Sequence, residues 1–366
     1  MNNTNNTHKA IILLITGTVL CMLLLPATGS EPDENGYKAD KPLSVHSHDI
    51  IKGGLTYSLG DSYYSGKLYS GDTYTVLYSV SLPDSANVKF ARLYNYWTWS
   101  AQGTTGVFPD MKLSFDGNEL TPEIKYEDRK GWDIYDYPSG NWIYNVTDFI
   151  NGSGSLSAII ENTGSDNAFF SISGLGLLIV YTDEKGEDME YWINEGCDIL
   201  NSQMNDDGTP LYYTTPDETI TKMMSPTIST ETVQHATLWT IVQGGNWEEN
   251  VLKVNDVNIT GICDGTPYPD MDIDERDISE NLVDGTNTIQ FQAVDDFAIP
   301  CGSILVIKKV SGTASVPPAT EHETSEDVTV DTPSESTSPS DTPGFGIIPA
   351  MVMLLAIIFF NKNRHR

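Results

Sequence analysis

Basic residues are scarce in this chain. Its 366 residues include 20 Lys and Arg against 51 Asp and Glu, which gives a formal net charge of −31 at pH 7. Nucleic acids and anionic lipids are repelled by such a surface, so neither is an expected partner. The same carboxylates attract cations and suit a salty or ion-rich exterior.

Histidine is also rare, and the motifs of familiar enzyme classes are missing. The chain has 6 His, and it lacks a His-Glu-x-x-His metal motif, a Gly-x-Ser-x-Gly nucleophile turn and a phosphate-binding loop. Few general bases are therefore available, and no glycosidase carboxylate pair can be assigned among so many acids. We therefore predict that the protein is not an enzyme.

Cysteine is the third scarcity. Of the 4 cysteines, Cys21 lies in an apolar N-terminal stretch, which leaves Cys197, Cys263 and Cys301. An odd number of cysteines outside the cell allows at most one intrachain disulfide. Cys263 and Cys301 lie in the same sequence repeat, so they are the predicted pair, and Cys197 is predicted to be a buried apolar residue.

Long apolar runs occur only at the two ends. Residues 10–25 follow a basic residue and precede small residues, which is the pattern of a secretory signal peptide over residues 1–29. The apolar residues 347–360 rise only about 21 Å as a helix, against roughly 30 Å of membrane hydrocarbon. Basic residues at both extreme ends place these ends in the cytoplasm and the chain between them outside the cell.

The C-terminal segment, residues 344–366, has the features of a sorting tail. Pro343, Gly344 and Phe345 precede a short apolar helix and an Arg-rich end. We expect this tail to be cut and replaced by a lipid, as a GPI signal is, because so short a run is a poor permanent anchor. The tail resembles the archaeal PGF-CTERM signal. An uncut membrane-spanning helix is the alternative.

Between the ends, the chain divides into a polar leader (30–48), a duplicated region and a stalk (311–343). The stalk is rich in Ser, Thr, Pro and acidic residues, so it is predicted to be disordered and O-glycosylated. The spacing of the duplicated segments is domain-sized, which predicts two tandem repeats over residues 49–186 and 187–310. The matching segments are 90–97 with 235–242, 111–118 with 251–258, 145–152 with 277–285, and 174–181 with 301–308.

Each repeat has the pattern of β structure. Residues 74–80 alternate in polarity, and Asp116-Gly117 predicts a tight hairpin turn. Outside the two ends, no long window keeps a helical stripe of apolar residues. We therefore predict an all-β fold of two tandem jelly-roll-like β-sandwich domains, with a signal peptide before them and a short C-terminal apolar helix after the stalk.

Five motifs resemble those of a known protein family. They are residues 91–99 (ARLYNYWTW), 128–131 (DRKG), 135–140 (YDYPSG), 191–196 (YWINEG) and 274–277 (DERD). These resemble the secreted surface proteins of methanogenic archaea that carry the domain of unknown function 3344. The resemblance implies an exported, surface-held β protein without an established activity, and it supplies no catalytic residue.

Three kinds of binding or modification site are predicted. Aromatic residues on one strand could stack on sugar rings, although a strand buried between two sheets explains them equally well. Alternate aspartates on one loop could hold a structural Ca²⁺, although a solvated loop is the alternative. Asn-x-Ser/Thr sequences outside the cell predict N-glycosylation. The residues are Tyr94, Tyr96, Trp97 and Trp99 for glycans; Asp270, Asp272 and Asp274 for Ca²⁺; and Asn145, Asn151 and Asn258 for N-glycosylation.

These observations favour an exported cell-envelope glycoprotein that is anchored at its C-terminus on the outer face of the membrane or in the cell wall. Its role would be structural or adhesive, with cell-envelope or surface-layer components and glycans as partners. A glycan-binding receptor that uses the aromatic strand is the first alternative. An extracellular polysaccharide hydrolase is the second.

Overall fold

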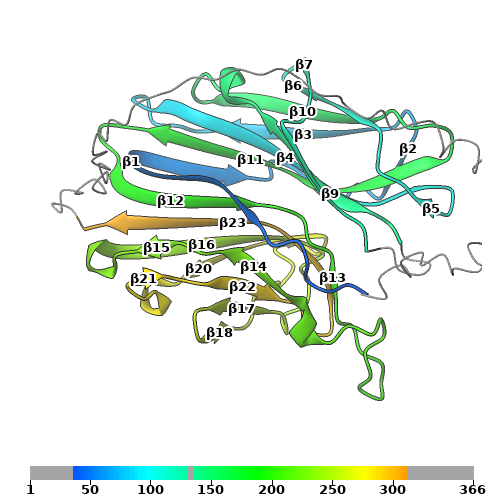
Figure 1. The fold of residues 1–366 in the computed structure, drawn as a ribbon. Helices are drawn as coiled ribbons and strands as arrows, with labels where there is room; N and C mark the ends of the chain where they lie inside the picture. Colours follow the sequence, from blue (N-terminus) through cyan, green and yellow to red (C-terminus); the bar gives the residue numbers. More distant parts are fainter. Residues whose placement is uncertain (1–35, 131–135, 311–366) are drawn as a thin grey trace, which may run out of the picture. The chain divides into compact units, whose positions relative to one another are not determined.

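The computed structural model describes residues 36–130 and 136–310, and these residues form β-strands joined by loops and short 3-10 turns (Figure 1). The predicted signal peptide, stalk and sorting tail lie outside the described residues, so their structures stay predictions. Within the described part of the chain, no helix is long and apolar enough to cross a membrane. The all-β fold class is confirmed.

The described residues before 187, which are 36–130 and 136–186, contain eleven strands. They are β1 (Ser44–Ser58), β2 (Lys67–Tyr69), β3 (Thr73–Val80), β4 (Asn87–Gln102), β5 (Thr105–Gly106), β6 (Met111–Phe115), β7 (Asn118–Leu120), β8 (Ile124–Asp128), β9 (Ser139–Asn145), β10 (Gly154–Asn162) and β11 (Ala168–Thr182), with the 3-10 turn η2 (Thr147–Phe149). The predicted hairpin turn joins β6 to β7, because Asp116 and Gly117 adopt φ values of 47° and 80° and Phe115 pairs with Asn118.

The second repeat contributes twelve strands. They are β12 (Glu187–Glu195), β13 (Leu200–Asn201), β14 (Ile220–Met224), β15 (Thr227–Ile228), β16 (Val233–Gln243), β17 (Val251–Val254), β18 (Val257–Ile259), β19 (Pro267–Tyr268), β20 (Met271–Asp277), β21 (Gly285–Thr286), β22 (Ile289–Gln292) and β23 (Phe297–Lys309). Three 3-10 turns, η3 (Pro216–Thr219), η4 (Thr230–Thr232) and η5 (Ser279–Asn281), lie between them.

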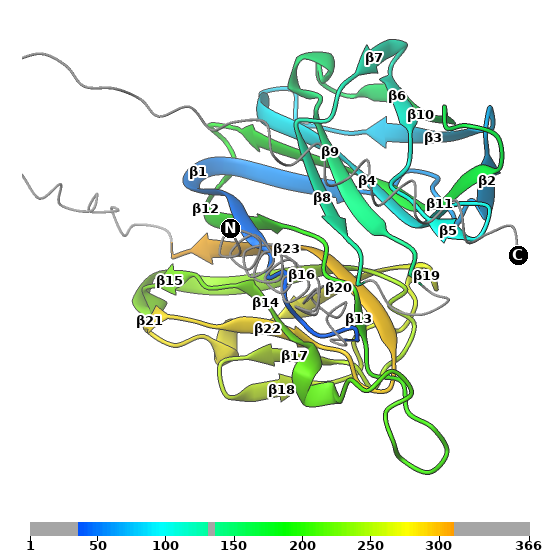
Figure 2. The same ribbon diagram turned by 45° about the vertical axis from the view of Figure 1, so that its right-hand side comes forward.

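One antiparallel sheet crosses both repeats. Its main strand order is β19-β20-β16-β23-β12-β1-β11-β4-β9-β8. β1 and β12 pair at its centre, and the strands that match in sequence, such as β4 with β16 and β11 with β23, lie at matching places on either side (Figure 2). The sequence duplication is therefore reflected in the strand order. The sheet is continuous across residue 186, so the strand order does not separate two domains at this point. The predicted domain boundary there stays a prediction.

Each half of the large sheet packs against a smaller sheet to make a sandwich, as the jelly-roll-like prediction expected. In the first half the smaller sheet is β3-β10-β6-β7, and in the second half it is β14-β22-β17-β18. Alternate residues of β3, among them Tyr74 and Val76, point into the first core together with Phe115. Leu252 and Phe291 occupy the second core in the same way.

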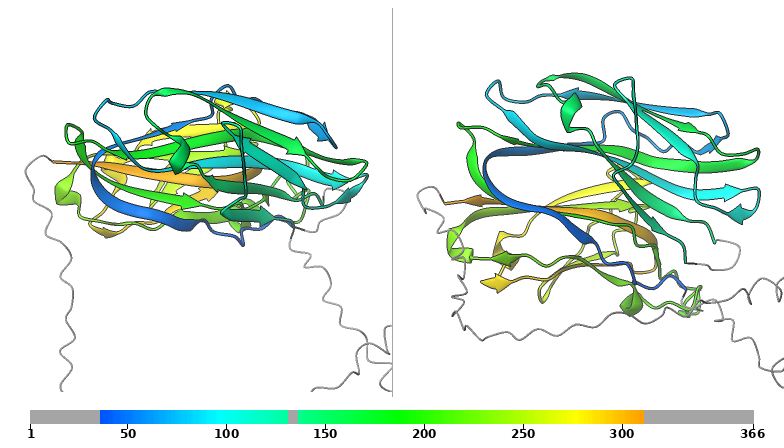
Figure 3. Two further views of the ribbon diagram at one scale, coloured as in Figure 1. Left: turned by 90° about the horizontal axis from the view of Figure 1, so that it is seen from above. Right: turned by 45° about the horizontal axis from the view of Figure 1, so that its top comes forward.

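A third core lies on the opposite face of the large sheet, and both repeats contribute to it. It contains Tyr94 and Tyr96 from β4 together with Ile241 from β16 and Ile304 from β23. The Tyr268 hydroxyl donates a hydrogen bond to the Ser173 carbonyl, 2.8 Å away, across the same region. Consecutive residues of β4, β11 and β23 are therefore buried on both faces of the sheet, whereas most residues of β1 are not. Figure 3 gives two further views of these strands.

The end of the predicted leader is part of this fold. Tyr37 and Leu43 are buried, with 3% and 4% of their surfaces exposed. The Leu43 amide donates to the Lys222 carbonyl at 3.0 Å, so this segment runs beside β14 of the second repeat before β1 begins. The leader pattern missed this because its apolar residues are isolated and meet partners that lie far away in the sequence.

Candidate functional site

The aromatic residues of β4 are mostly buried. Tyr94, Tyr96 and Trp97 expose 4%, 0% and 0% of their surfaces. Tyr94 and Tyr96 lie in the central core, whereas Trp97 lies in the first sandwich core. A sugar cannot stack on a ring that protein covers, so the predicted glycan platform is wrong for these three residues. The alternative explanation, a central strand buried on both faces, is correct for them.

Trp99 is the exception. Its φ of 55° and the register shift where β4 pairs with β11 mark a bulge, which turns the indole out of the alternating pattern. The half-buried ring stacks on Phe297 from the second repeat, with centroids 5.4 Å apart, and meets the edge of Tyr137 at 6.0 Å. An open cleft of about 310 Å³ lies beside it, and its lining residues are Tyr64, Lys67, Trp99, Tyr137, Phe169 and Ser171.

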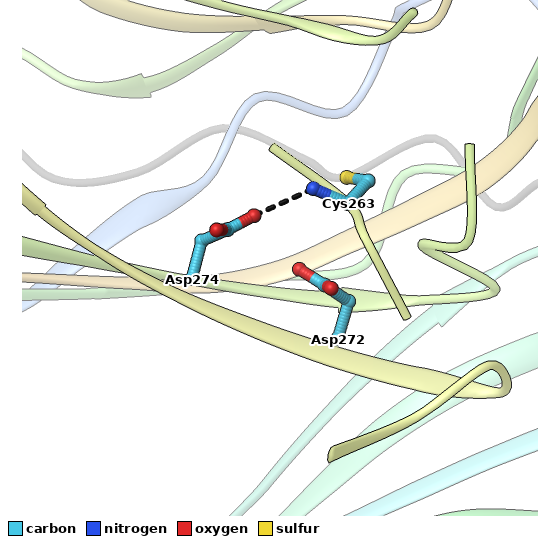
Figure 4. Close-up of side chains that lie close together, drawn as sticks. All are labelled: Cys263, Asp272 and Asp274. Carbon is cyan, nitrogen blue, oxygen red and sulfur yellow. Dashed lines mark hydrogen bonds between the residues drawn. The ribbon is translucent and has the colours of Figure 1, made fainter. Parts of the chain in front are cut away.

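A second cluster joins Cys263, Asp272 and Asp274 (Figure 4). Asp272 and Asp274 are alternate residues of β20, so their side chains share one face of the sheet. Their neighbours Met271 and Ile273 pack on the opposite face, in the central core. Cys263 comes from the loop between β18 and β19 and belongs to the core of the second sandwich. The cluster therefore lies inside the second sandwich.

Backbone and side-chain groups hold these carboxylates in place. Asp272 Oδ2 accepts hydrogen bonds from the Gly265 and Thr266 amides at 3.0 and 3.2 Å. Asp274 Oδ2 accepts from the Cys263 amide at 2.6 Å, and Asp274 Oδ1 lies 2.5 Å from Arg276 Nη2. Each carboxylate thus ties the 261–266 loop to β20.

The cluster is almost sealed from solvent. Cys263 and Asp272 expose 0% of their surfaces and Asp274 exposes 5%. Burial, and next the charge of Asp274, raise the pKa of Asp272 to about 8, and burial raises the pKa of the Cys263 thiol. Asp272 Oδ1 is buried, and apart from a proton shared with Asp274 it has no hydrogen-bond partner. Two facing carboxylates of this kind are stable only when a proton or a cation lies between them.

The loop between β16 and β17 closes over the cluster at Gly245. A Cβ atom added at this position would lie 2.7 Å from Asp272 Cβ and 3.3 Å from Cys263 Sγ. Only glycine therefore allows the loop to approach so closely. A glycine inside a polar loop carries no sequence signal for such a role.

The predicted Ca²⁺ set is only partly assembled. Asp272 and Asp274 lie together, but Asp270 is not among the residues whose ligand atoms converge. Asp270 instead lines a separate pocket of about 250 Å³, which Trp99 also lines. The sequence prediction missed Cys263, because an isolated cysteine on a distant loop gives no spacing pattern.

A second acidic cluster, formed by Asp40, Asp128 and Asp198, already contains its own cation. Lys130 Nζ lies 3.0 Å from Asp128 Oδ2 and from Asp198 Oδ1, and 2.5 Å from Asp40 Oδ1. Burial lowers the pKa of Lys130, but the charges of Asp128 and Asp198 outweigh it and the pKa is raised. An ammonium group thus occupies the place that a metal ion would take, so we interpret this cluster as structural.

The predicted disulfide between Cys263 and Cys301 is absent. Cys197, Cys263 and Cys301 are buried free thiols. Cys263 belongs to the core of the second sandwich, whereas Cys301 belongs to the central core on the opposite face of the large sheet. Membership of one repeat was therefore not enough to bring the two sulfurs together. The prediction that Cys197 is a buried apolar residue is confirmed, with 3% of its surface exposed.

The predicted glycosylation sites lie on the surface. Asn145, Asn151 and Asn258 are all exposed. A glycan could therefore be attached at each without disturbing a core, although the modification itself stays a prediction. Pro343, Gly344 and Phe345 of the predicted sorting signal lie outside the described residues.

Comparison with known proteins identifies the family. Residues 36–308 match the family model described as "Protein of unknown function (DUF3344)", so the chain belongs to that family. The predicted membership of the domain of unknown function 3344 family is thereby confirmed, whereas the archaeal origin and the PGF-CTERM tail stay predictions. No curated protein matches the chain.

Among solved structures, the similarity is distant. The major capsid protein P2 from bacteriophage PM2 is 7% identical with a TM-score of 0.21, and the match covers 74% of this chain and 100% of that one. The α-L-rhamnosidase of Streptomyces avermitilis, solved with L-rhamnose, is 12% identical with a TM-score of 0.19, and the match covers 72% of this chain and 29% of that one. Neither likeness supports a functional argument.

Proposed function

We propose that the protein is an exported module of the cell envelope, held at the outer surface by its C-terminal tail, with a structural or adhesive role. One observation carries this proposal. A compact, acidic β unit with three exposed glycosylation sequences lies between a segment with signal-peptide features and a segment with sorting-tail features. Carboxylate-rich surfaces and attached glycans both suit an exterior environment.

The location is tested on intact cells. External protease should degrade the protein without lysis, and intact-mass measurement of the purified native chain should show loss of residues 1–29 and of the apolar tail, with an added lipid. Glycans should appear at the three sequences and vanish one by one in Asn→Gln variants. A chain that still carries Met1 and is found only inside the cell would contradict export.

Glycan binding is the second candidate, and the cleft beside Trp99 favours it. Half-buried aromatic rings next to polar groups commonly bind sugars. The ring faces contact the sugar C–H groups, and the polar groups form hydrogen bonds with the sugar hydroxyls. Lys67, which lies with its Nζ 4.1 Å from the centre of the Phe169 ring, supplies such a group here, whereas the hydroxyl of Ser171, which also lines the cleft, is buried.

A glycan array with the native chain tests this candidate. Binding should fall at least tenfold in Trp99→Ala. Trp247→Ala is the matched control, since Trp247 is 44% exposed and is not part of the cleft lining. A chain that binds no glycan, or two variants that bind equally well, would leave the structural role without this activity.

A further inference from the structure

We propose that Cys263, Asp272 and Asp274 bind one divalent transition-metal ion of the zinc class inside the second sandwich. The three ligand atoms, a sulfur and two carboxylate oxygens, all lie within 4.8 Å of one another. Zinc binds sulfur at about 2.3 Å and carboxylate oxygen at about 2.0–2.2 Å, so small side-chain movements suffice to bring these atoms onto one ion. This inference does not depend on export or on glycan binding.

A second, independent observation points to a missing ligand. Asp272 Oδ1 is fully buried and accepts no hydrogen bond from an N–H group, so only a proton shared with Asp274 or a bound cation would satisfy it, while the other oxygen of the same carboxylate accepts two backbone amides. A buried acceptor without a partner is destabilising, and more so when it is charged. Figure 4 shows this carboxylate directed towards Asp274 and Cys263. A bound cation at this place would satisfy it.

The set of donors decides the class of metal. Calcium takes six to eight oxygen ligands and has little affinity for sulfur. A thiolate together with carboxylates suits zinc and its neighbours among the transition metals. Cys263 is a free thiol, so its sulfur is available as a ligand. Compared with the predicted calcium site, the observed cluster contains Cys263 in place of Asp270. This set of ligands suits a softer ion than calcium.

The charges close to the site also balance. A thiolate and two carboxylates carry three negative charges, and Arg276, paired with Asp274, carries one positive charge. A divalent ion would neutralise the remainder, which is what a sealed, low-dielectric site requires.

The surrounding structure already orients the ligands. The Gly265, Thr266 and Cys263 amides fix the two carboxylates, and Gly245 lets the covering loop approach. Outer contacts of this kind hold metal ligands in position and tune their affinity. Three protein ligands leave one position for water or for a second carboxylate oxygen, as is usual for a four-coordinate ion. The ion would tie the 261–266 loop to β20.

Cobalt gives the sharpest test, because its thiolate complexes absorb in the near ultraviolet. The native chain, stripped with a chelator, should bind one equivalent of Co²⁺ with a thiolate charge-transfer band, and Zn²⁺ should abolish this band. Zn²⁺ should also raise the melting temperature in a concentration-dependent way, whereas Ca²⁺ should not.

Variants separate this site from the acidic surface. Cys263→Ser should remove the charge-transfer band, and both Cys263→Ser and Asp272→Asn should lower Zn²⁺ affinity at least tenfold. Cys197→Ser is the matched control, because it alters a buried thiol outside the cluster and should leave binding unchanged. If Cys263→Ser does not fold, the Zn²⁺ affinity of the Asp272→Asn variant tests the proposal by itself.

Three results would overturn the proposal. These are the absence of a thiolate band, binding that is unchanged in Asp272→Asn, and a wild-type chain that binds no ion while Asp272→Asn is more stable. The last result would mean that the two carboxylates share a proton instead of a metal ion.

Discussion

The pKa of an individual acidic residue depends on its burial and not on the overall charge of the chain. Asp296 exposes 7% of its surface, and its Oδ2 accepts a hydrogen bond from Asn250 Nδ2 at 2.7 Å. Burial raises the pKa of Asp296 to about 6 despite this hydrogen bond. Few of the many acidic residues in the sequence are buried as Asp296 is. The sequence around Asp296 gives no signal that this residue is buried.

Replacing Asp296 by Asn should therefore stabilise the protein above pH 6. In the wild type, the folded state holds the Asp296 proton more tightly than the unfolded state, so this residue's contribution is present below about pH 4 and is lost as the pH rises through about 6. We expect Asp296→Asn to raise the free energy of unfolding by roughly 1–3 kcal/mol at pH 8 and by little at pH 4. Urea unfolding at both pH values measures this. The exposed Asp166→Asn serves as control, and equal gains at both pH values would contradict the assignment.

The three thiols form a second residue-scale prediction. All three are buried, and burial raises the pKa of the Cys197 and Cys263 thiols well above its usual range, so little reactive thiolate is present. A thiol reagent should leave Cys197, Cys263 and Cys301 unmodified in the native, chelator-treated chain and should label all three after denaturation. Peptide mass analysis reads each site, and a single labelled site in the denatured chain would indicate a disulfide.

At the scale of elements, one buried ion pair links β4 of the first repeat to the end of β12. Arg92 Nε and Nη2 donate to the two carboxylate oxygens of Glu195 at 2.7 and 3.0 Å, and the Tyr94 hydroxyl donates to Glu195 at 2.8 Å. Arg92 exposes 3% of its surface and Glu195 exposes 0%. Arg92 Nη1 also pairs with Glu123 Oε2 at 2.9 Å, so Arg92 would keep a partner if Glu195 were lost, whereas removing Arg92 would leave the buried Glu195 carboxylate without its guanidinium partner.

We expect Arg92→Ala to lower the free energy of unfolding by about 3–5 kcal/mol. Arg129 provides a matched control, because it makes a similar two-bonded pair with Asp136 in which the side chains are 35% and 29% exposed. Arg129→Ala should cost less than about 1 kcal/mol. Denaturant unfolding of both variants tests the difference, and equal losses would show that burial is not the deciding factor. The double variant Arg92→Met with Glu195→Leu should recover part of the loss.

At the scale of the whole described unit, the two repeats depend on each other. β1 pairs with β12 from Ser44 to Gly53, and the central core takes residues from both repeats. A chain cut after residue 186 would expose the edge of β1 and the rings of Tyr94 and Tyr96 to water. Such an edge, flanked by an apolar face, promotes aggregation.

Residues 36–310 should therefore unfold in one cooperative transition. Tryptophan fluorescence and circular dichroism should give the same denaturant midpoint, because neither repeat can keep its half of the sheet alone. Residues 36–186 expressed by themselves should aggregate or lack fixed tertiary structure. Two separate transitions, or a soluble and cooperatively folding fragment 36–186, would show instead that the repeats are independent domains.

The sequence by itself determined the fold class, the duplication and the family. Alternating polarity, hairpin turns such as Asp116-Gly117 and repeated strand segments are local signals, because each depends on neighbours along the chain. The motif around Trp97 likewise indicated the family correctly. These features do not require knowledge of which strands meet in space.

Only the tertiary structure decided which residues are buried and which side chains meet. In the sequence, Tyr96 and Trp97 cannot be told from exposed sugar-binding rings. In the structure they are core residues, because protein covers the large sheet on both faces at this strand. Cys263 and Cys301 lie in one repeat, yet a sheet separates them, whereas Cys263 meets Asp272 and Asp274 through loop closure over Gly245. Such contacts arise from how sheets stack and loops close, and residues far apart in the chain carry no local signal of them.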